Sequence, residues 1–156
     1  MKKELTDIDF MRLALKEAEK ASKKGEAPIG AVIVKDGAVI SAAHNLREKK
    51  KNALYHAEVL AIDKACKKLG GWRLPRCTLY VTLEPCPMCA GAIINSRIDR
   101  VVFGASDKKA GSVCSVVDLF SLDYNHKPLC EGGVLAEECG EILTKFFKNL
   151  RKKEKN

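Results

Sequence analysis

Apolar residues recur along the chain at two spacings, one typical of helices and one typical of strands. Over residues 7–24 they return every three or four positions, and a basic pair followed by glycine marks the end, which predicts an amphipathic helix. Residues 29–34 are almost entirely apolar, and Asp36-Gly37 separates them from a second apolar run at 38–43. Because Asp-Gly is a strong hairpin signal, this stretch predicts an antiparallel strand pair.

The rest of the chain continues to alternate between helix and strand patterns. We expect helices at 56–69, 85–94 and 135–151, strands at 78–83 and 100–105, a short helix at 113–120, and irregular segments at 44–54 and 121–133. Such alternation favours the α/β class, here a three-layer α/β/α sandwich around a mixed sheet of about five strands. No linker or repeat divides residues 1–156, so we expect a single domain with a frayed basic tail at 150–156.

Composition narrows the choice of partner and compartment. The chain has 28 Lys and Arg against 20 Asp and Glu, a net charge of +8, which favours a polyanionic partner such as nucleic acid without requiring one. No run approaches the roughly 20 apolar residues of a membrane span, and the first residues lack the apolar core of a signal peptide. We therefore expect no membrane association and a cytoplasmic location, where cysteine pairs bind metal more often than they form disulfides.

One pair among the seven cysteines has the spacing of metal ligands. Cys86 and Cys89 stand three residues apart at the start of a predicted helix, so both thiols can reach one ion, and His56 offers a third ligand. Three such ligands leave one position of a Zn²⁺ ion open, as in catalytic sites. Taken alone, Cys-x-x-Cys fits a redox pair or half of a zinc knuckle as well. We expect the other cysteines to be small buried hydrophobic residues: Cys66, Cys77, Cys114, Cys130 and Cys139.

Glu58 lies two positions after His56 and is not needed as a ligand. His-x-Glu followed by Pro-Cys-x-x-Cys is the known signature of the zinc-dependent nucleobase deaminases, whose glutamate acts as general acid and base. We predict that Glu58 takes a proton from the attacking water and returns protons to the ring nitrogen and the leaving ammonia. The alternative is an acidic residue that only stabilises the start of a helix.

The chain also resembles the bacterial tRNA-specific adenosine deaminases over nearly its whole length. The resemblance is carried by His56-Ala57-Glu58, by residues 79–92 (LYVTLEPCPMCAGA), and by shorter matches at 27–30, 44–45, 72–74, 102–105, 107, 125–126 and 146–147. It implies a cytidine-deaminase-like fold, one zinc ion per chain, a homodimer, and conversion of adenosine to inosine at the wobble position of a tRNA anticodon stem-loop.

The same resemblance assigns substrate contacts to three further residues. Asn45 is expected to hydrogen-bond the flipped base, Asp107 to contact its ribose, and Phe147 to stack on an RNA base. Each has a structural alternative, because Asn favours turns and Asp107 lies in a loop. Phe146 and Phe147 are adjacent and cannot share one helix face, so we expect one of them in the core.

Two rival functions remain open at this stage. A deaminase of free guanine, cytosine or nucleosides would share the zinc motif but would not need a basic surface or salt-sensitive binding. A non-enzymatic RNA-binding module, with a structural zinc ion, would not need Glu58.

Overall fold

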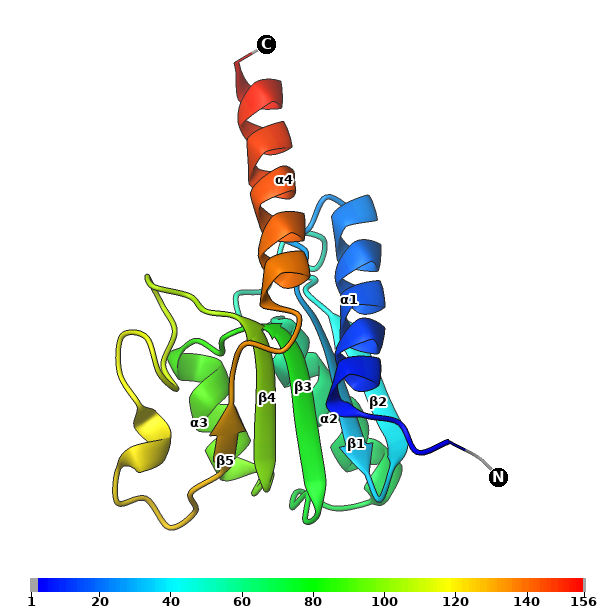
Figure 1. Ribbon diagram of the computed structural model, residues 1–156, viewed down its shortest axis with the longest axis vertical. Helices are drawn as coiled ribbons and strands as arrows, with labels where there is room; N and C mark the ends of the chain where they lie inside the picture. Colours follow the sequence, from blue (N-terminus) through cyan, green and yellow to red (C-terminus); the bar gives the residue numbers. More distant parts are fainter. Residues whose placement is uncertain (1–2, 156) are drawn as a thin grey trace.

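The computed structural model describes residues 3–155, in which five strands form one sheet in the order β2-β1-β3-β4-β5 (Figure 1). The strands are β1 (Gly30–Lys35), β2 (Ala38–His44), β3 (Cys77–Leu83), β4 (Arg100–Ala105) and β5 (Leu129–Glu131). Strand β1 pairs antiparallel with β2 and with β3, whereas β4 pairs parallel with β3 and with β5. The sheet is therefore mixed, and the hairpin expected around Asp36-Gly37 is confirmed.

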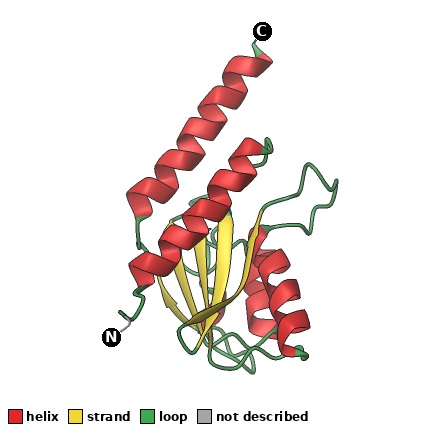
Figure 2. Ribbon diagram, turned by 90° about the vertical axis from the view of Figure 1, so that its right-hand side faces the viewer, coloured by secondary structure: helices red, strands yellow, loops and turns green. Residues whose placement is uncertain are grey.

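Helices cover both faces of the sheet (Figure 2). Helices α1 (Asp7–Lys23) and α4 (Ala136–Glu154) lie on one face, and α2 (Ala57–Leu69) and α3 (Pro87–Asn95) on the other. Because successive strand residues point to opposite faces, Val32 and Tyr80 pack under α1, whereas Ile33 and Leu79 pack under α2 and α3. The fold is the three-layer α/β/α sandwich that the sequence predicts.

A polar network ties the start of α1 to the sheet. The guanidinium of Arg100 donates to both carboxylate oxygens of Asp7, at 2.9 and 2.7 Å, and to Glu131 at 2.7 Å. The Tyr80 hydroxyl also donates to Asp7, at 2.7 Å. The hydrogen bond from Arg100 lowers the pKa of Asp7 below its ordinary value, so the carboxylate stays charged well into the acid range.

The structure corrects the sequence expectations for the segment between β4 and α4. The helix expected at 113–120 is wrong: only a short 3₁₀ turn forms there, Leu119–Ser121, and Val116 is 59% exposed. The backbone N–H groups of Val116 and Leu119 donate to carbonyls five and seven residues earlier, those of Gly111 and Ser112, so the stretch does not form the i to i−4 ladder of an α-helix. Strand β5 lies in the part expected to be irregular, and its three residues are too few to produce a pattern.

Two further expectations about the chain need correction. Helix α4 continues to Glu154, so most of the tail expected to be frayed is helical; Asn156 lies outside the described residues. Of the five cysteines expected to be buried, Cys77 and Cys139 are buried and Cys66 is half-buried. Cys114 is exposed in the irregular segment after β4, and Cys130 is exposed in β5, at the edge of the sheet. No helix within residues 3–155 is long and apolar enough to cross a membrane.

Candidate metal centre and active site

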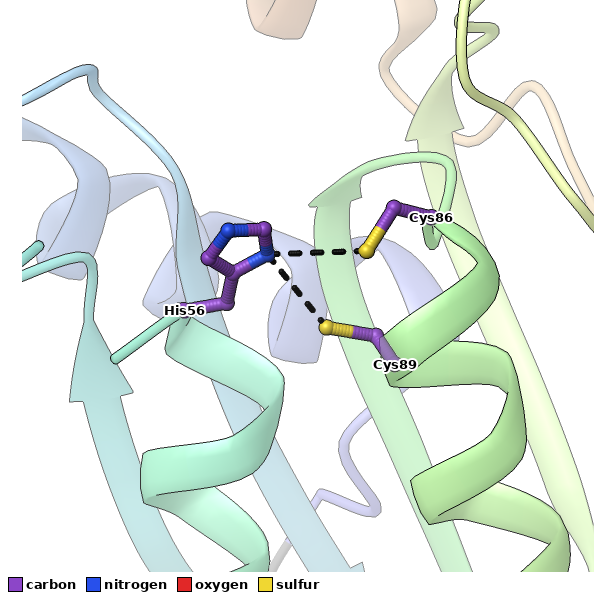
Figure 3. Close-up of side chains that lie close together, drawn as sticks. All are labelled: His56, Cys86 and Cys89. Atoms are coloured by element: carbon purple, nitrogen blue, oxygen red, sulfur yellow. Dashed lines mark hydrogen bonds between the residues drawn. The ribbon is translucent and has the colours of Figure 1, made fainter. Parts of the chain in front are cut away.

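Two helix N-termini bring the metal-ligand candidates together. His56 is the N-cap residue of α2, and Cys86 is the N-cap residue of α3, which follows β3 directly. Both caps have an extended backbone, and neither side chain caps its own helix, so both side chains are free to point across the gap between the helices. Cys89 joins them from the first turn of α3, and the three side chains converge (Figure 3).

The spacing of these three side chains fits a zinc ion. The Nδ1 atom of His56 lies 3.6 Å from Sγ of Cys86 and 3.5 Å from Sγ of Cys89. A tetrahedral site with Zn–S distances of about 2.3 Å and Zn–N distances of about 2.0–2.1 Å separates its ligand atoms by about 3.6 Å. Among residues 3–155, this is the group of His, Cys, Asp and Glu side chains in which three ligand atoms lie within 4.8 Å of one another.

The two thiols share their protons unequally. The hydrogen bond with Cys89, followed by the one with His56, lowers the pKa of Cys86 to about 4, although burial opposes this. The same hydrogen bond and burial raise the pKa of Cys89, and the bond to Cys86 raises the pKa of His56. Cys86 is therefore the thiol that ionises first, and a metal ion that binds here must displace the proton of Cys89 and any proton that His56 holds on the ligand nitrogen.

Glu58 lies in the first turn of α2 and is buried, with 4% of its surface exposed. Burial is the main cause that raises its pKa to about 7, and the negative charge on Cys86 adds to the effect. A carboxyl group with such a pKa can both accept and release a proton near neutral pH. The geometry thus separates a ligand set from a neighbouring proton carrier.

A pocket of about 200 Å³ opens beside the ligand set. Asn45, Asp107 and Phe147 all line it, although they come from the end of β2, the loop after β4 and helix α4. The full lining is Ala27, Ile29, Asn45, Arg47, His56, Ala57, Glu58, Leu83, Glu84, Cys86, Asp107, Ala110 and Phe147. Every sequence-predicted site residue except Cys89 therefore lines this pocket. Cys89 is buried and lies next to His56, as a member of the ligand set.

Asn45 and Asp107 also shape the loops that hold them. The Oδ1 atom of Asn45 accepts from the backbone N–H of Arg47 at 3.1 Å, the arrangement of an Asx turn. Asp107 Oδ1 accepts from the N–H groups of Lys109 and Ala110, at 3.1 and 3.2 Å. The structural alternative considered for each residue is thus present together with a position in the pocket.

The paired phenylalanines of α4 have different surroundings. Phe147 is 43% exposed and lines the pocket, whereas Phe146 is half-buried in a groove of about 410 Å³ between α1 and α4. Their rings meet edge to face, with centroids 5.3 Å apart. The expectation that one of them is a core residue is wrong, because much of α4 extends past the sheet and only Cys139 of this helix is buried (Figure 1).

Comparison with known proteins decides the family. A family model described as MafB19-like deaminase matches residues 6–151. A tRNA-specific adenosine deaminase of Bacillus subtilis is 55% identical over 147 residues, which are 94% of this chain and 91% of that protein. The chain belongs to the tRNA-specific adenosine deaminase family. The family assignment agrees with the resemblance found in the sequence.

Solved structures agree with this family. A structure from a study of A-to-I editing by tRNA:A34 deaminases at the wobble position has a TM-score of 0.84 and 47% identity, covering 86% of this chain and 98% of that one. A guanine deaminase from Bacillus subtilis is more distant, with a TM-score of 0.65 and 34% identity over 93% of this chain and 95% of that one. The chain is therefore similar in structure to both a tRNA-acting and a guanine-acting deaminase. The TM-score and the sequence identity are both higher for the tRNA-acting one.

Sequence reasoning missed two polar members of the pocket wall of this deaminase. Arg47 reads as one of many basic residues in a polar loop, and no local signal separates it from the lysines that follow. Glu84 lies within residues 79–92, but the zinc signature gives it no role. The one local signal is a charged residue at the end of an apolar strand, directly before Pro85, since a carboxylate that is buried there needs hydrogen-bond partners.

Proposed function

We propose that this chain is a zinc-dependent hydrolase that converts adenosine to inosine at the wobble position of a tRNA anticodon. The observation that carries the proposal is the convergence of His56, Cys86 and Cys89 into one ligand set, beside a pocket that Glu58 lines. That convergence occurs in a chain 55% identical to a tRNA-specific adenosine deaminase. Water adds to carbon 6 of the base and ammonia leaves, so the reaction needs one activated water and one proton carrier.

His56, Cys86 and Cys89 are the proposed zinc ligands, one ion per chain. Zinc in a three-ligand site acts as a Lewis acid that lowers the pKa of a water in the open position to about 7. The two cysteines and the histidine come from the starts of α2 and α3, where helix dipoles favour negative charge. The protein's part is to hold three ligands at the spacing described above.

Glu58 is the proposed general acid and base. It accepts one proton from the attacking water and donates it to N1 of the purine ring, then takes the second proton from the same oxygen and donates it to the amino group, which leaves as ammonia. The raised pKa of about 7 suits a group that must be ionised at the start and protonated midway. Its place inside the pocket, at 4% exposure, keeps bulk water from supplying competing protons.

The pocket is too small to hold more than the base that reacts. Its volume of about 200 Å³ lies below the roughly 300–1,000 Å³ of pockets that enclose drug-sized ligands. Flanking nucleotides must then lie outside, over Arg47, Asp107 and Phe147 at the rim. We propose that Asn45 holds the flipped base, Asp107 its ribose, and Phe147 a neighbouring base. An anticodon loop suits this geometry because its bases are unstacked at low cost.

A homodimer in the cytoplasm completes the proposal. Large apolar side chains are exposed along the segment between β4 and α4, at the β5 side of the molecule: Val116, Val117, Leu122, Tyr124 and Leu129. Exposed apolar side chains on one segment suit contact with a second copy of the chain. A dimer mass in solution, measured by light scattering, supports this part of the proposal, and a monomer mass at micromolar concentration contradicts it.

The experiment compares an anticodon stem-loop with free adenosine, guanine and cytosine across a salt series. We expect the protein to deaminate the stem-loop and none of the free compounds. Its affinity for the stem-loop should fall as salt rises, with a slope of log affinity against log salt of about −0.7 per neutralised phosphate. Turnover of a free base without any activity on RNA would instead identify the protein as a free-base deaminase. The structural similarity to a guanine deaminase is the reason to test this alternative.

A further inference from the structure

A second glutamate of the pocket has no task in the proposed reaction. Glu84 lies between the end of β3 and the ligand Cys86, and only 2% of its surface is exposed. A buried carboxylate is costly unless hydrogen bonds satisfy it. The partners that satisfy Glu84 therefore indicate what the residue is for.

All side-chain partners of Glu84 come from one segment, the loop that follows β4. Its Oε1 atom accepts from the backbone N–H of Asp107 at 3.1 Å and from the hydroxyl of Ser115. Its Oε2 atom accepts from the backbone N–H groups of Cys114 and Ser115, at 2.9 and 2.8 Å. One carboxylate thus joins both ends of residues 107–115.

The rest of this loop is built closely around the carboxylate. Gly111 passes so near that a Cβ added to it would lie 2.3–2.4 Å from the carboxylate atoms of Glu84. The N–H of Ser112 donates to the carbonyl of Pro85 at 2.8 Å. Asp107 and Ala110, which line the pocket, belong to this same loop. Their position therefore depends on a side chain that comes from a different part of the sequence.

The chemistry of these contacts requires a carboxylate. An ionised carboxylate only accepts hydrogen bonds and has about four lone-pair sites, and here four donors use them. A carboxamide of equal size would turn an NH₂ group toward N–H donors and lose at least one hydrogen bond.

We propose that Glu84 is a positioning residue that holds the loop of residues 107–115 so that Asp107 faces the ribose of the target nucleotide. This inference rests on the proposed function for its substrate, although the loop contacts themselves do not. Glu84 acts through Asp107, because all four donors to its carboxylate belong to this loop. The loop and the metal ligands are thereby linked through one short segment, Glu84-Pro85-Cys86.

The test uses the full-length zinc-loaded protein and the variant Glu84→Gln, with Glu131→Gln as the matched control. Glu131 is an exposed carboxylate at β5 that pairs with Arg100, outside the pocket lining. We expect Glu84→Gln to keep its zinc and to raise hydrogen exchange of peptides covering 107–115 by about tenfold or more, the scale of one charge-assisted hydrogen bond. Its KM for an anticodon stem-loop should rise about tenfold with kcat within about twofold, because the lost contact is uniform binding. Glu131→Gln should leave the zinc content, the hydrogen exchange of residues 107–115, KM and kcat unchanged.

Combination with Asp107→Ala separates positioning from general damage. If Glu84 acts through Asp107, Glu84→Gln adds little to the KM of Asp107→Ala, whereas independent effects multiply. Multiplying effects, unchanged loop exchange, or loss of zinc overturn the proposal. Should Glu84→Gln fail to fold, Ser115→Ala removes one donor from the same carboxylate and should give a smaller change in the same direction. A wild-type protein inactive on RNA would refute the proposed function, while hydrogen exchange would still decide whether Glu84 holds the loop.

Discussion

Replacing Phe147 by alanine should weaken catalysis on RNA while leaving the protein as stable as before. Phe147 lines the pocket beside the ligand set, yet 43% of the residue's surface is exposed. Stacking of one base on an aromatic ring contributes about 1–3 kcal/mol, which corresponds to a fall of about 5- to 150-fold in kcat/KM. Because the side chain is already exposed, the free energy of unfolding should change by no more than about 0.5 kcal/mol.

Phe146→Ala is the matched control, since it removes the same edge-to-face contact between the two rings. Phe146 is half-buried between α1 and α4, so its loss should cost about half of the roughly 3–5 kcal/mol of a fully buried phenylalanine. Its kcat/KM on the stem-loop should change little. Both variants are measured by thermal unfolding and by steady-state kinetics on an anticodon stem-loop. The reasoning is refuted if Phe147→Ala is unstable with normal kcat/KM, or if the two variants behave alike.

Three other predictions follow from the site and its surroundings. Glu58→Ala should keep one zinc per chain by elemental analysis but lose about 10²–10⁴-fold in kcat, and loss of its zinc would contradict the assigned role. Cys86→Ala should lose the metal and unfold at a lower temperature, because the ligand set joins α2 to α3; retained stoichiometric zinc would contradict this. Asp7, whose pKa Arg100 depresses below 3.8, contributes stability above that pH that is lost as pH falls through its folded-state pKa. Asp7→Asn should therefore be less stable at neutral pH and lose less stability on acidification; equal acid sensitivity in chemical denaturation would refute the network.

The elements with strong local signals could be predicted from the sequence. The hairpin at Asp36-Gly37 and the helix after His56 depend on turn chemistry and on periodicity within a few residues. Strand β5 could not be found in this way, because three residues that pair with distant β4 carry no period of their own. Val116 and Val117 look like part of a buried helix, but the structure leaves both on the surface.

In the candidate site, too, the residues with a local sequence signal could be predicted and those that depend on distant contacts could not. His56, Cys86 and Cys89 were predicted because metal ligands need particular residue types at particular spacings, which a sequence displays. The part that Glu84 plays depends on a loop that begins 23 residues later, where Asp107 donates to it. Nothing in the local sequence of either segment announces that contact, and only the folded sheet brings β3 and the end of β4 side by side.

The central claim is tested most directly by mapping inosine in tRNA transcripts after incubation with the purified zinc-loaded protein. The account predicts inosine at the wobble position of the anticodon and at no other adenosine, with Glu58→Ala forming it about 10²–10⁴-fold more slowly. An absence of inosine from every transcript, together with ammonia release from free guanine or cytosine, would contradict it.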